Sequence, residues 1–124
     1  MEPSLRTTAI AISIGRVALG AGLIAAPERI ARGWIGPVAT ERSVEVLARS
    51  VGIRDVVLGA GGSAALLGGH SATRGWLLAA AVADVGDVVA TLLAREVLPA
   101  NGVRATAALA SGSMVVCAAA AAQA

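Results

Sequence analysis

Six ionisable residues lie inside long apolar stretches of this 124-residue chain, and these residues are the best placed to do chemistry. Three are cations and three are anions: Arg16, Arg49, Arg54, Asp55, Asp84 and Asp87. A charged side chain at the centre of a bilayer costs at least about 2.5–3.5 kcal/mol on insertion scales, so isolated charges would be unfavourable there. Because arginine forks can bridge carboxylates, we expect one connected network in the interior of the fold.

Acid–base chemistry is the chemistry that this set predicts. Asp84 and Asp87 are three residues apart and share a helix face with Thr91. Two carboxylates this close resist double ionisation, so one could hold a proton and act as a general acid. Three nearby arginines could equally keep both ionised, and the sequence leaves both states open. The candidate catalytic residues are Asp84, Asp87 and Asp55, and the candidate ligand-binding or charge-network residues are Arg16, Arg49, Arg54 and Thr91.

Small residues accompany the charges at helical spacing. The expected stripes are Ser13, Arg16 and Gly20 on one stretch, Gly52, Asp55, Gly59 and Gly62 on a second, and Thr106, Ala110, Ser113 and Cys117 on another. Small side chains let neighbouring helices approach closely, as in small-xxx-small packing. Glu45 and Arg49 are four residues apart and are expected to pair near one end of their helix.

Four apolar stretches must position these residues. They cover residues 7–26, 44–67, 75–98 and 103–122. Each has the length of about 20 residues that a helix needs to cross about 30 Å of hydrocarbon. Short joints make consecutive spans antiparallel neighbours, so we expect an all-α, up-down bundle of four transmembrane helices. Residues 1–124 would then form a single integral membrane domain.

The composition favours a membrane as the surroundings of this bundle. Hydrophobic residues make up 56% of the chain, charged residues only 15%, and the mean hydropathy is +0.78. Soluble domains carry about 25% charged residues. A soluble Ala/Gly-rich bundle is the alternative. A cleaved signal peptide over the first stretch is disfavoured because Arg16 interrupts that stretch and the later stretches are also hydrophobic.

The joints carry interface signals. Residues 28–37 could form a short helix in the membrane interface, with Trp34 at headgroup depth. Residues 68–76 and 98–102 are expected to be turns. Five arginines flank the first and third joints and two flank the opposite side. The positive-inside rule therefore predicts a multi-pass protein of the cell (inner) membrane with both termini outside.

Other kinds of site find little support. The chain has no basic run and no aromatic stacking platform, so nucleic-acid binding is not expected. The only histidine, His70, lies in a predicted turn, and no Cys/His cluster offers a metal site, so no metal and no cofactor is expected. Cys117 lies in an Ala-rich apolar run and is expected to be a small buried residue.

The chain contains three characteristic segments in order: "GRVALGAG…AP", "ARSVGIRDVVLG" and "W…ADVGDVVATLLA". In this arrangement it resembles a group of small bacterial four-helix membrane proteins, common in actinobacteria and of unknown function. The most specific parts are "GIRDVVLG" (52–59) and "DVGD" (84–87). The resemblance covers most of the chain and implies a fold and a membrane location, but no activity. In size and style the chain is also similar to DoxX-type proteins and to integral-membrane terpene cyclases. The cyclases use intramembrane carboxylates to protonate an epoxide or alkene, but no motif here matches them residue by residue.

Three functions follow as hypotheses. The first is an intramembrane site for a lipophilic small molecule, such as an isoprenoid, quinone or epoxide, with acid–base chemistry; it predicts a cavity that reaches the network. The second is a structural or accessory subunit that forms a homo-oligomer or docks to a membrane partner, with the network fixing helix register. The third is an ion or proton pathway, which would require an oligomer and which the arginines disfavour for cations.

Overall fold

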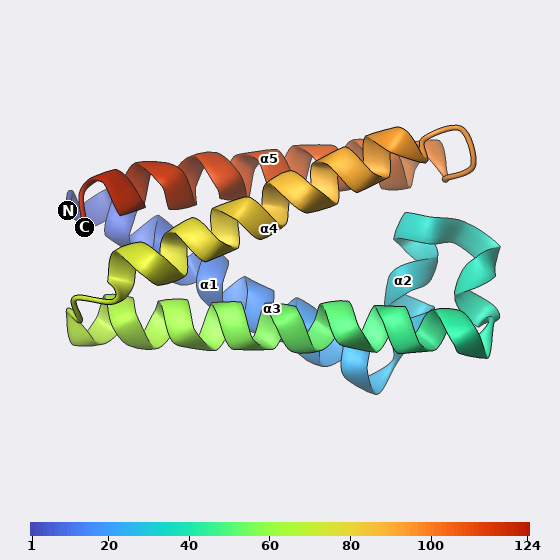
Figure 1. Cartoon of the computed structure of the whole chain (residues 1–124), viewed down its shortest axis with the longest axis horizontal. Helices are drawn as coiled ribbons and strands as arrows, with labels where there is room; N and C mark the ends of the chain where they lie inside the picture. Colours follow the sequence, from blue (N-terminus) through green and yellow to red (C-terminus); the bar gives the residue numbers. More distant parts are fainter.

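The computed structural model describes all 124 residues and is built from helices alone. The elements in chain order are α1 (Pro3–Ala25), α2 (Pro27–Ile35), the 3-10 helix η1 (Gly36–Thr40), α3 (Arg42–Gly68), α4 (Thr73–Leu93) and α5 (Ala100–Ala122) (Figure 1). The predicted all-α class is therefore confirmed. By length and composition, the four long helices α1, α3, α4 and α5 could each cross a membrane.

Proline and glycine set several of the helix ends. Pro27 occupies the first turn of α2, where its missing N–H would be unpaired in any case. Gly36 has φ 79° and lets the chain reverse from α2 into η1. Gly69 has φ 65° and ends α3 in the left-handed conformation that favours glycine. The predicted short helix over residues 28–37 is thus present as α2, ending at Ile35.

The third and fourth predicted spans had wrong boundaries. Helix α4 ends at Leu93 rather than at residue 98, and the chain then turns, with the Val97 amide donating to the Ala94 carbonyl at 3.0 Å. Pro99 is the N-cap of α5, so residues 100–102, predicted as part of a turn, already belong to this helix. The hydropathy pattern extended the predicted third span to residue 98 because Val97 and Leu98 are apolar, although both lie in the turn.

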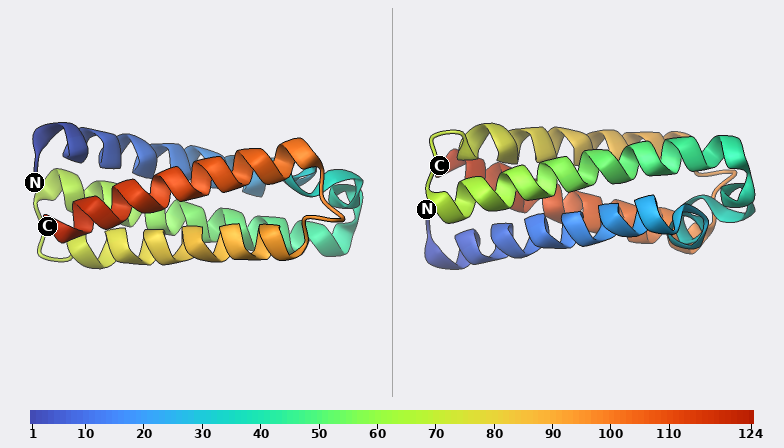
Figure 2. Two further views of the ribbon diagram at one scale, coloured as in Figure 1. Left: turned by 90° about the horizontal axis from the view of Figure 1, so that it is seen from above. Right: turned by 90° about the horizontal axis from the view of Figure 1, so that it is seen from below.

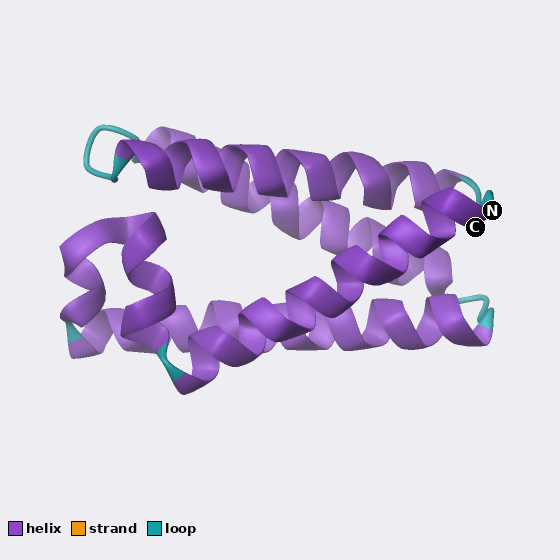
Figure 3. Ribbon diagram, turned by 180° about the vertical axis from the view of Figure 1, so that it is seen from behind, coloured by secondary structure: helices purple, strands orange, loops and turns teal.

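Consecutive long helices run in opposite directions, and the two termini lie at the same end (Figures 1 and 2). Helix α1 packs along α3, and α4 packs along α5, to give two pairs. The pairs diverge toward the end where α2 and η1 lie between α3 and the start of α5 (Figure 3). A Cβ on Gly102 of α5 would lie 2.8 Å from the Trp34 carbonyl oxygen, so α2 and α5 are in close contact there.

The α1–α3 contact is made by the two predicted glycine stripes. A Cβ on Gly52 would lie 2.7 Å from the Gly20 carbonyl oxygen, and one on Gly59 would lie 2.8 Å from Val17 Cγ2. Real side chains do not fit at such distances, so the backbones are closer than any larger residue permits. The larger of the two apolar core clusters combines two leucines with small residues: Ala9, Leu66, Leu77, Ala80, Ala81, Cys117, Ala120 and Ala121. Cys117 is buried, as predicted.

Candidate functional site

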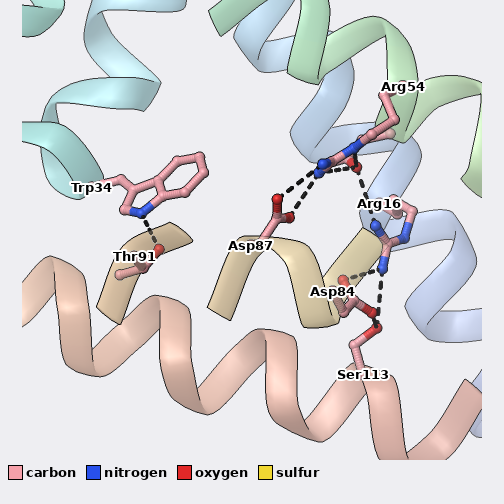
Figure 4. A network of polar contacts seen from close by, with 8 residues as sticks. Arg16, Trp34, Arg54, Asp84, Asp87, Thr91 and Ser113 are labelled. Atoms are coloured by element: carbon pink, nitrogen blue, oxygen red, sulfur yellow. Dashed lines mark hydrogen bonds and ion pairs between the residues drawn. The ribbon is translucent and has the colours of Figure 1, made fainter. Parts of the chain in front are cut away.

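The centre of the candidate site is Arg16, which enters the bundle from α1 and is only 9% exposed. Its Nη1 donates to Asp55 Oδ1 of α3 at 3.1 Å, and its Nη2 donates to Asp84 Oδ1 of α4 at 2.6 Å (Figure 4). Asp55 and Asp84 are each 4% exposed. One guanidinium group therefore joins three helices through charge-assisted hydrogen bonds.

Arg54 of α3 forms the second half of the network. Its Nη1 and Nη2 donate to the two carboxylate oxygens of Asp87 at 2.9 and 2.7 Å, a bidentate pairing. Its Nε and Nη2 also donate to Asp55 Oδ1, at 3.3 and 3.1 Å. This half is more open, because the side chains of Arg54 and Asp87 are 33% and 20% exposed. Asp55 thus bridges the buried arginine and the partly exposed one.

Ser113 of α5 completes the network, although sequence reasoning gave it no role beyond a small, mildly polar stripe. Its hydroxyl donates to Asp84 Oδ2 at 2.7 Å and accepts from Arg16 Nη2 at 3.2 Å (Figure 4). The sequence signal that could have identified Ser113 was its place in that stripe, because the stripe puts a hydroxyl group on the face of α5 that packs toward α4. The network therefore touches all four long helices.

Five of the predicted charges come together, but Arg49 does not. Arg49 precedes Asp55 by six residues, which rotates it by about 240° around the helix. Its Nε donates to the Ile24 carbonyl at the end of α1 at 3.2 Å, and Nη1 lies 3.5 Å from Glu45 Oε2. The predicted Glu45–Arg49 pair is present, with the arginine side chain half exposed. Including Arg49 in the network was wrong because its helix face points to the end of α1.

Thr91 also lies outside the network. It is 1% exposed, and its hydroxyl oxygen accepts a hydrogen bond from Trp34 Nε1 at 3.0 Å (Figure 4). Thr91 is seven residues after Asp84, so it shares the predicted face but lies about two helical turns away. The Trp34 indole turns inward from α2 to contact α4, and its headgroup depth stays a prediction. This bond joins α2 to α4.

An apolar pocket of about 190 Å³ lies beside this tryptophan, between α1, α2 and α3. Its lining is entirely apolar: Leu23, Ala31, Trp34, Ile35, Val44, Leu47, Ala48 and Val51. No network residue lines it, in contrast to the cavity that the sequence led us to expect. Two of its lining residues are nevertheless close in the chain, or through a hydrogen bond, to residues of the network. Val51 is one turn from Arg54 on α3, and Trp34 bonds to Thr91, one turn from Asp87.

A larger and more open hollow, of about 430 Å³, lies at the turn between α1 and α2. Its lining is mostly charged: Ala26, Pro27, Glu28, Arg29, Arg32 and Glu45. Glu28 and Arg32 form an exposed ion pair of 2.8 Å across one helical turn. None of the network residues lines this hollow, so it is a charged recess at the end of the bundle and separate from the candidate site.

Comparison with known proteins adds no functional assignment to this geometry. No model of a protein family, no curated protein and no solved structure matches the chain.

Proposed function

We propose that the protein is a multi-pass protein of the cell (inner) membrane, an up-down bundle that binds a small lipophilic molecule in the apolar pocket. The observation that carries this proposal is the position of the pocket, whose lining residue Val51 lies about one helical turn from Arg54, in the partly exposed half of the arginine–aspartate network. We also propose that the protein belongs with the small bacterial four-helix membrane proteins of DoxX-like size that its sequence resembles. Ionisable residues within membrane helices commonly mark a functional site.

The size of the pocket limits its occupant. Apolar cavities of about 150 Å³ bind benzene, so a pocket of about 190 Å³ suits a short apolar segment rather than a whole lipid. The end of an isoprenoid chain fits this description. A polar group at the end of such a segment would lie near Arg54 and Asp87, the partly exposed end of the network.

Acid–base conversion of an isoprenoid or epoxide is the reaction class that this placement favours. A carboxylic acid of the network would protonate the epoxide oxygen, and one ring C–O bond would break. The carboxylate left behind would then take a proton from a carbon next to the cation, which balances the reaction. An arginine N–H could hold the oxygen in place during both steps.

Tryptophan fluorescence tests the binding site directly, because the chain has only two tryptophans and Trp34 lines the pocket. In a Trp76→Phe background, Trp34 becomes the sole reporter. A brominated short-chain alcohol, whose bromine quenches indole fluorescence, is titrated into the protein in detergent or lipid. We expect saturable quenching, because a defined pocket holds a limited number of molecules.

A matched pair of substitutions on α3 separates binding from partition into lipid. Ala48→Leu fills the pocket, whereas Ala60→Leu adds the same volume on an exposed part of the same helix. Saturable quenching should disappear with Ala48→Leu and persist with Ala60→Leu. Linear quenching that is equal in all three proteins would contradict the proposed site.

A structural or accessory role is the second candidate, and one observation favours it. The network bonds join residues of all four long helices, which is sufficient to fix their register. This role predicts that a stoichiometric membrane partner or a second copy co-purifies in mild detergent. It also predicts that Asp84→Asn and Asp87→Asn, although they weaken the network, are harmless to the biological function of the assembly.

A further inference from the structure

The charged recess and the apolar pocket are neighbours, because the same two helices line both of them. Helix α2 packs against the first part of α3 (Figure 1). On α2, Glu28 of the recess is three residues before Ala31 of the pocket. On α3, Glu45 of the recess is three residues before Ala48 of the pocket. Side chains three residues apart lie next to each other on a helix surface, so the two hollows share a border.

The recess carries one positive charge that has no partner within the protein. Arg32 pairs with Glu28 at 2.8 Å, and Glu45 pairs with Arg49 at 3.5 Å. Arg29 makes no ion pair and no side-chain hydrogen bond, although two carboxylates line the same recess. Because the two pairs are each neutral, the guanidinium group of Arg29 is available to an anion from outside the chain.

Phosphate is the anion that suits this recess. The guanidinium fork of arginine donates two parallel N–H groups to phosphate oxygens, and a phosphate ester is negatively charged at neutral pH. Arg29 and Arg32 lie on the exposed side of α2, whereas Ala31 is buried. In the proposed membrane topology this short helix lies at headgroup depth, where the phosphate groups of lipids are found.

We propose that the recess binds the phosphate group of a lipid and that the apolar pocket holds the adjoining part of its hydrocarbon chain. Arg29 is the main contact of the phosphate, and Arg32 is the second. This inference rests on the proposed ligand pocket and specifies its ligand as a lipid phosphate. A free phosphate ion reaches the recess alone, whereas a lipid phosphate fills both hollows.

The same placement directs the rest of the ligand toward the network. Val51 of the pocket follows Glu45 of the recess by six residues, or about 9 Å along α3. Arg54 follows Glu45 by nine residues, or about 14 Å. A chain anchored at the recess therefore extends through the pocket toward Arg54, while its phosphate stays at the end of the bundle. Any conversion at the network acts on the chain and leaves the phosphate ester intact.

Two ligands that differ only in the phosphate group test this inference. The full-length Trp76→Phe protein in non-ionic detergent is titrated with the brominated short-chain alcohol and with its phosphate monoester. Quenching of Trp34, which lines the pocket, gives both dissociation constants. We expect the monoester to bind about tenfold more tightly, because it adds charge-assisted contacts near the surface. Saturable binding of both with equal affinity would overturn this inference and leave the pocket in place. No saturable binding of either ligand would overturn the proposed function as well.

Arg29→Gln and Arg104→Gln form a matched pair of variants. Each removes an arginine that makes no ion pair, at the same end of the molecule, but only Arg29 lines the recess. We expect Arg29→Gln to weaken binding of the monoester by about threefold or more and Arg104→Gln to leave it unchanged. Binding of the alcohol should be the same in both. Equal weakening of monoester binding by the two variants would indicate diffuse attraction to arginines and would contradict a defined phosphate site.

Glu28→Gln provides a test in the opposite direction. It releases Arg32 from its ion pair and removes a negative charge from the recess. The monoester should therefore bind more tightly to this variant, a gain that a folding defect does not produce. Weaker binding would contradict the assigned role of Arg32.

Inorganic phosphate distinguishes a lipid phosphate from a free phosphate ion. Added as a competitor, it should displace the monoester only at concentrations far above those at which the monoester itself binds, because it makes no contact with the pocket. Displacement at equal concentrations would identify a site for free phosphate and overturn the assignment of a lipid.

Discussion

At the scale of single residues, two arginines with similar surroundings in the sequence have different roles. Arg16 is buried and bonds to Asp55 and Asp84, whereas Arg49 is half exposed and bonds to the end of α1 and to Glu45. Buried ion pairs are weak evidence for net stability, but breaking one leaves an uncompensated charge in the interior. The two residues should therefore differ sharply when they are replaced by an apolar residue.

Arg16→Met is expected to lower the free energy of unfolding by about 3–5 kcal/mol, because Asp84 loses its guanidinium partner in a buried position. Arg49→Met, the control, should cost less than about 1 kcal/mol because its ion pair is exposed. Unfolding in mixed micelles of mild detergent and dodecyl sulfate, followed by tryptophan fluorescence, measures both. Equal losses for the two variants would contradict the assigned positions.

Glu2 gives the first helix a dependence on pH outside the proposed membrane span. The Ser4 hydroxyl donates to its carboxylate at 2.6 Å, and the Ser4 and Leu5 amides also donate to it as the N-cap of α1. These bonds lower the pKa of Glu2 below its ordinary 4.5. Because the folded state holds the proton less tightly, this contribution is complete above pH 4.5 and is lost as pH falls through the lowered pKa.

The wild type should therefore be more stable than Glu2→Gln above that range, and the difference should shrink to nothing in acid. Thermal unfolding of both proteins over a series of pH values measures this difference. Glu96→Gln, which alters an exposed glutamate in the turn after α4, supplies the loss of one surface carboxylate for comparison. A difference that grows as the pH falls would have the opposite sign and would exclude the N-cap role of Glu2.

At the scale of helices, glycines decide how near α1 and α3 can lie. Gly20, Gly52 and Gly59 leave no space for a side chain between the two backbones. This proximity lets Arg16 reach Asp55 across the pair at 3.1 Å. Packing and charge are thus linked, because a larger residue on this face would separate the groups that the network must join.

Gly59→Ala is expected to cost about 1–3 kcal/mol of stability, because its Cβ would lie 2.8 Å from Val17 Cγ2 and also meet the α1 backbone. Gly86→Ala is the matched control on α4, where no atom lies within 4 Å of the added carbon. That substitution should be neutral or stabilise the helix by up to about 1 kcal/mol. The same detergent unfolding assay compares them, and a harmless Gly59→Ala would disprove the close α1–α3 contact.

At the scale of the whole molecule, large apolar side chains cover much of the outer surface, and one cluster of charges lies within an otherwise largely apolar interior. Large apolar side chains point outward along the long helices, with Leu47, Val82, Leu93 and Leu109 each more than 60% exposed. Aspartate and arginine occupy the centre at 4–9% exposure. This distribution suits surroundings of lipid, which solvate apolar side chains and disfavour charges.

Membrane orientation can be tested with single cysteines in a Cys117→Ala background. Ser71→Cys lies in the turn between α3 and α4, at the end of the molecule that holds both termini, and Glu41→Cys lies at the opposite end. The arginine count predicts that an impermeant thiol reagent labels Ser71→Cys on intact spheroplasts and labels Glu41→Cys only after lysis. The reverse pattern would invert the topology, and labelling of both sites from outside would argue against membrane insertion.

Much of the fold could be read from the sequence because hydropathy and helical spacing are local properties. The four long apolar stretches became four long helices, and the stripes of Gly20, Gly52 and Gly59 lie at a helix contact. Helix ends were less predictable where apolar residues occupy a turn, as Val97 and Leu98 do. Such residues satisfy a hydropathy pattern whether or not the backbone continues as a helix.

The sequence by itself determined which groups are present: the three aspartates, the arginines within apolar stretches and the helical faces that they share. Only the tertiary structure decided their partners. It directed Arg49 to the end of α1, brought Ser113 to Asp84, and bonded Thr91 to Trp34 instead of to the network. The physical reason is that spacing fixes a direction around one helix axis. The neighbour in that direction depends on how four helices pack, through contacts between residues far apart in the chain.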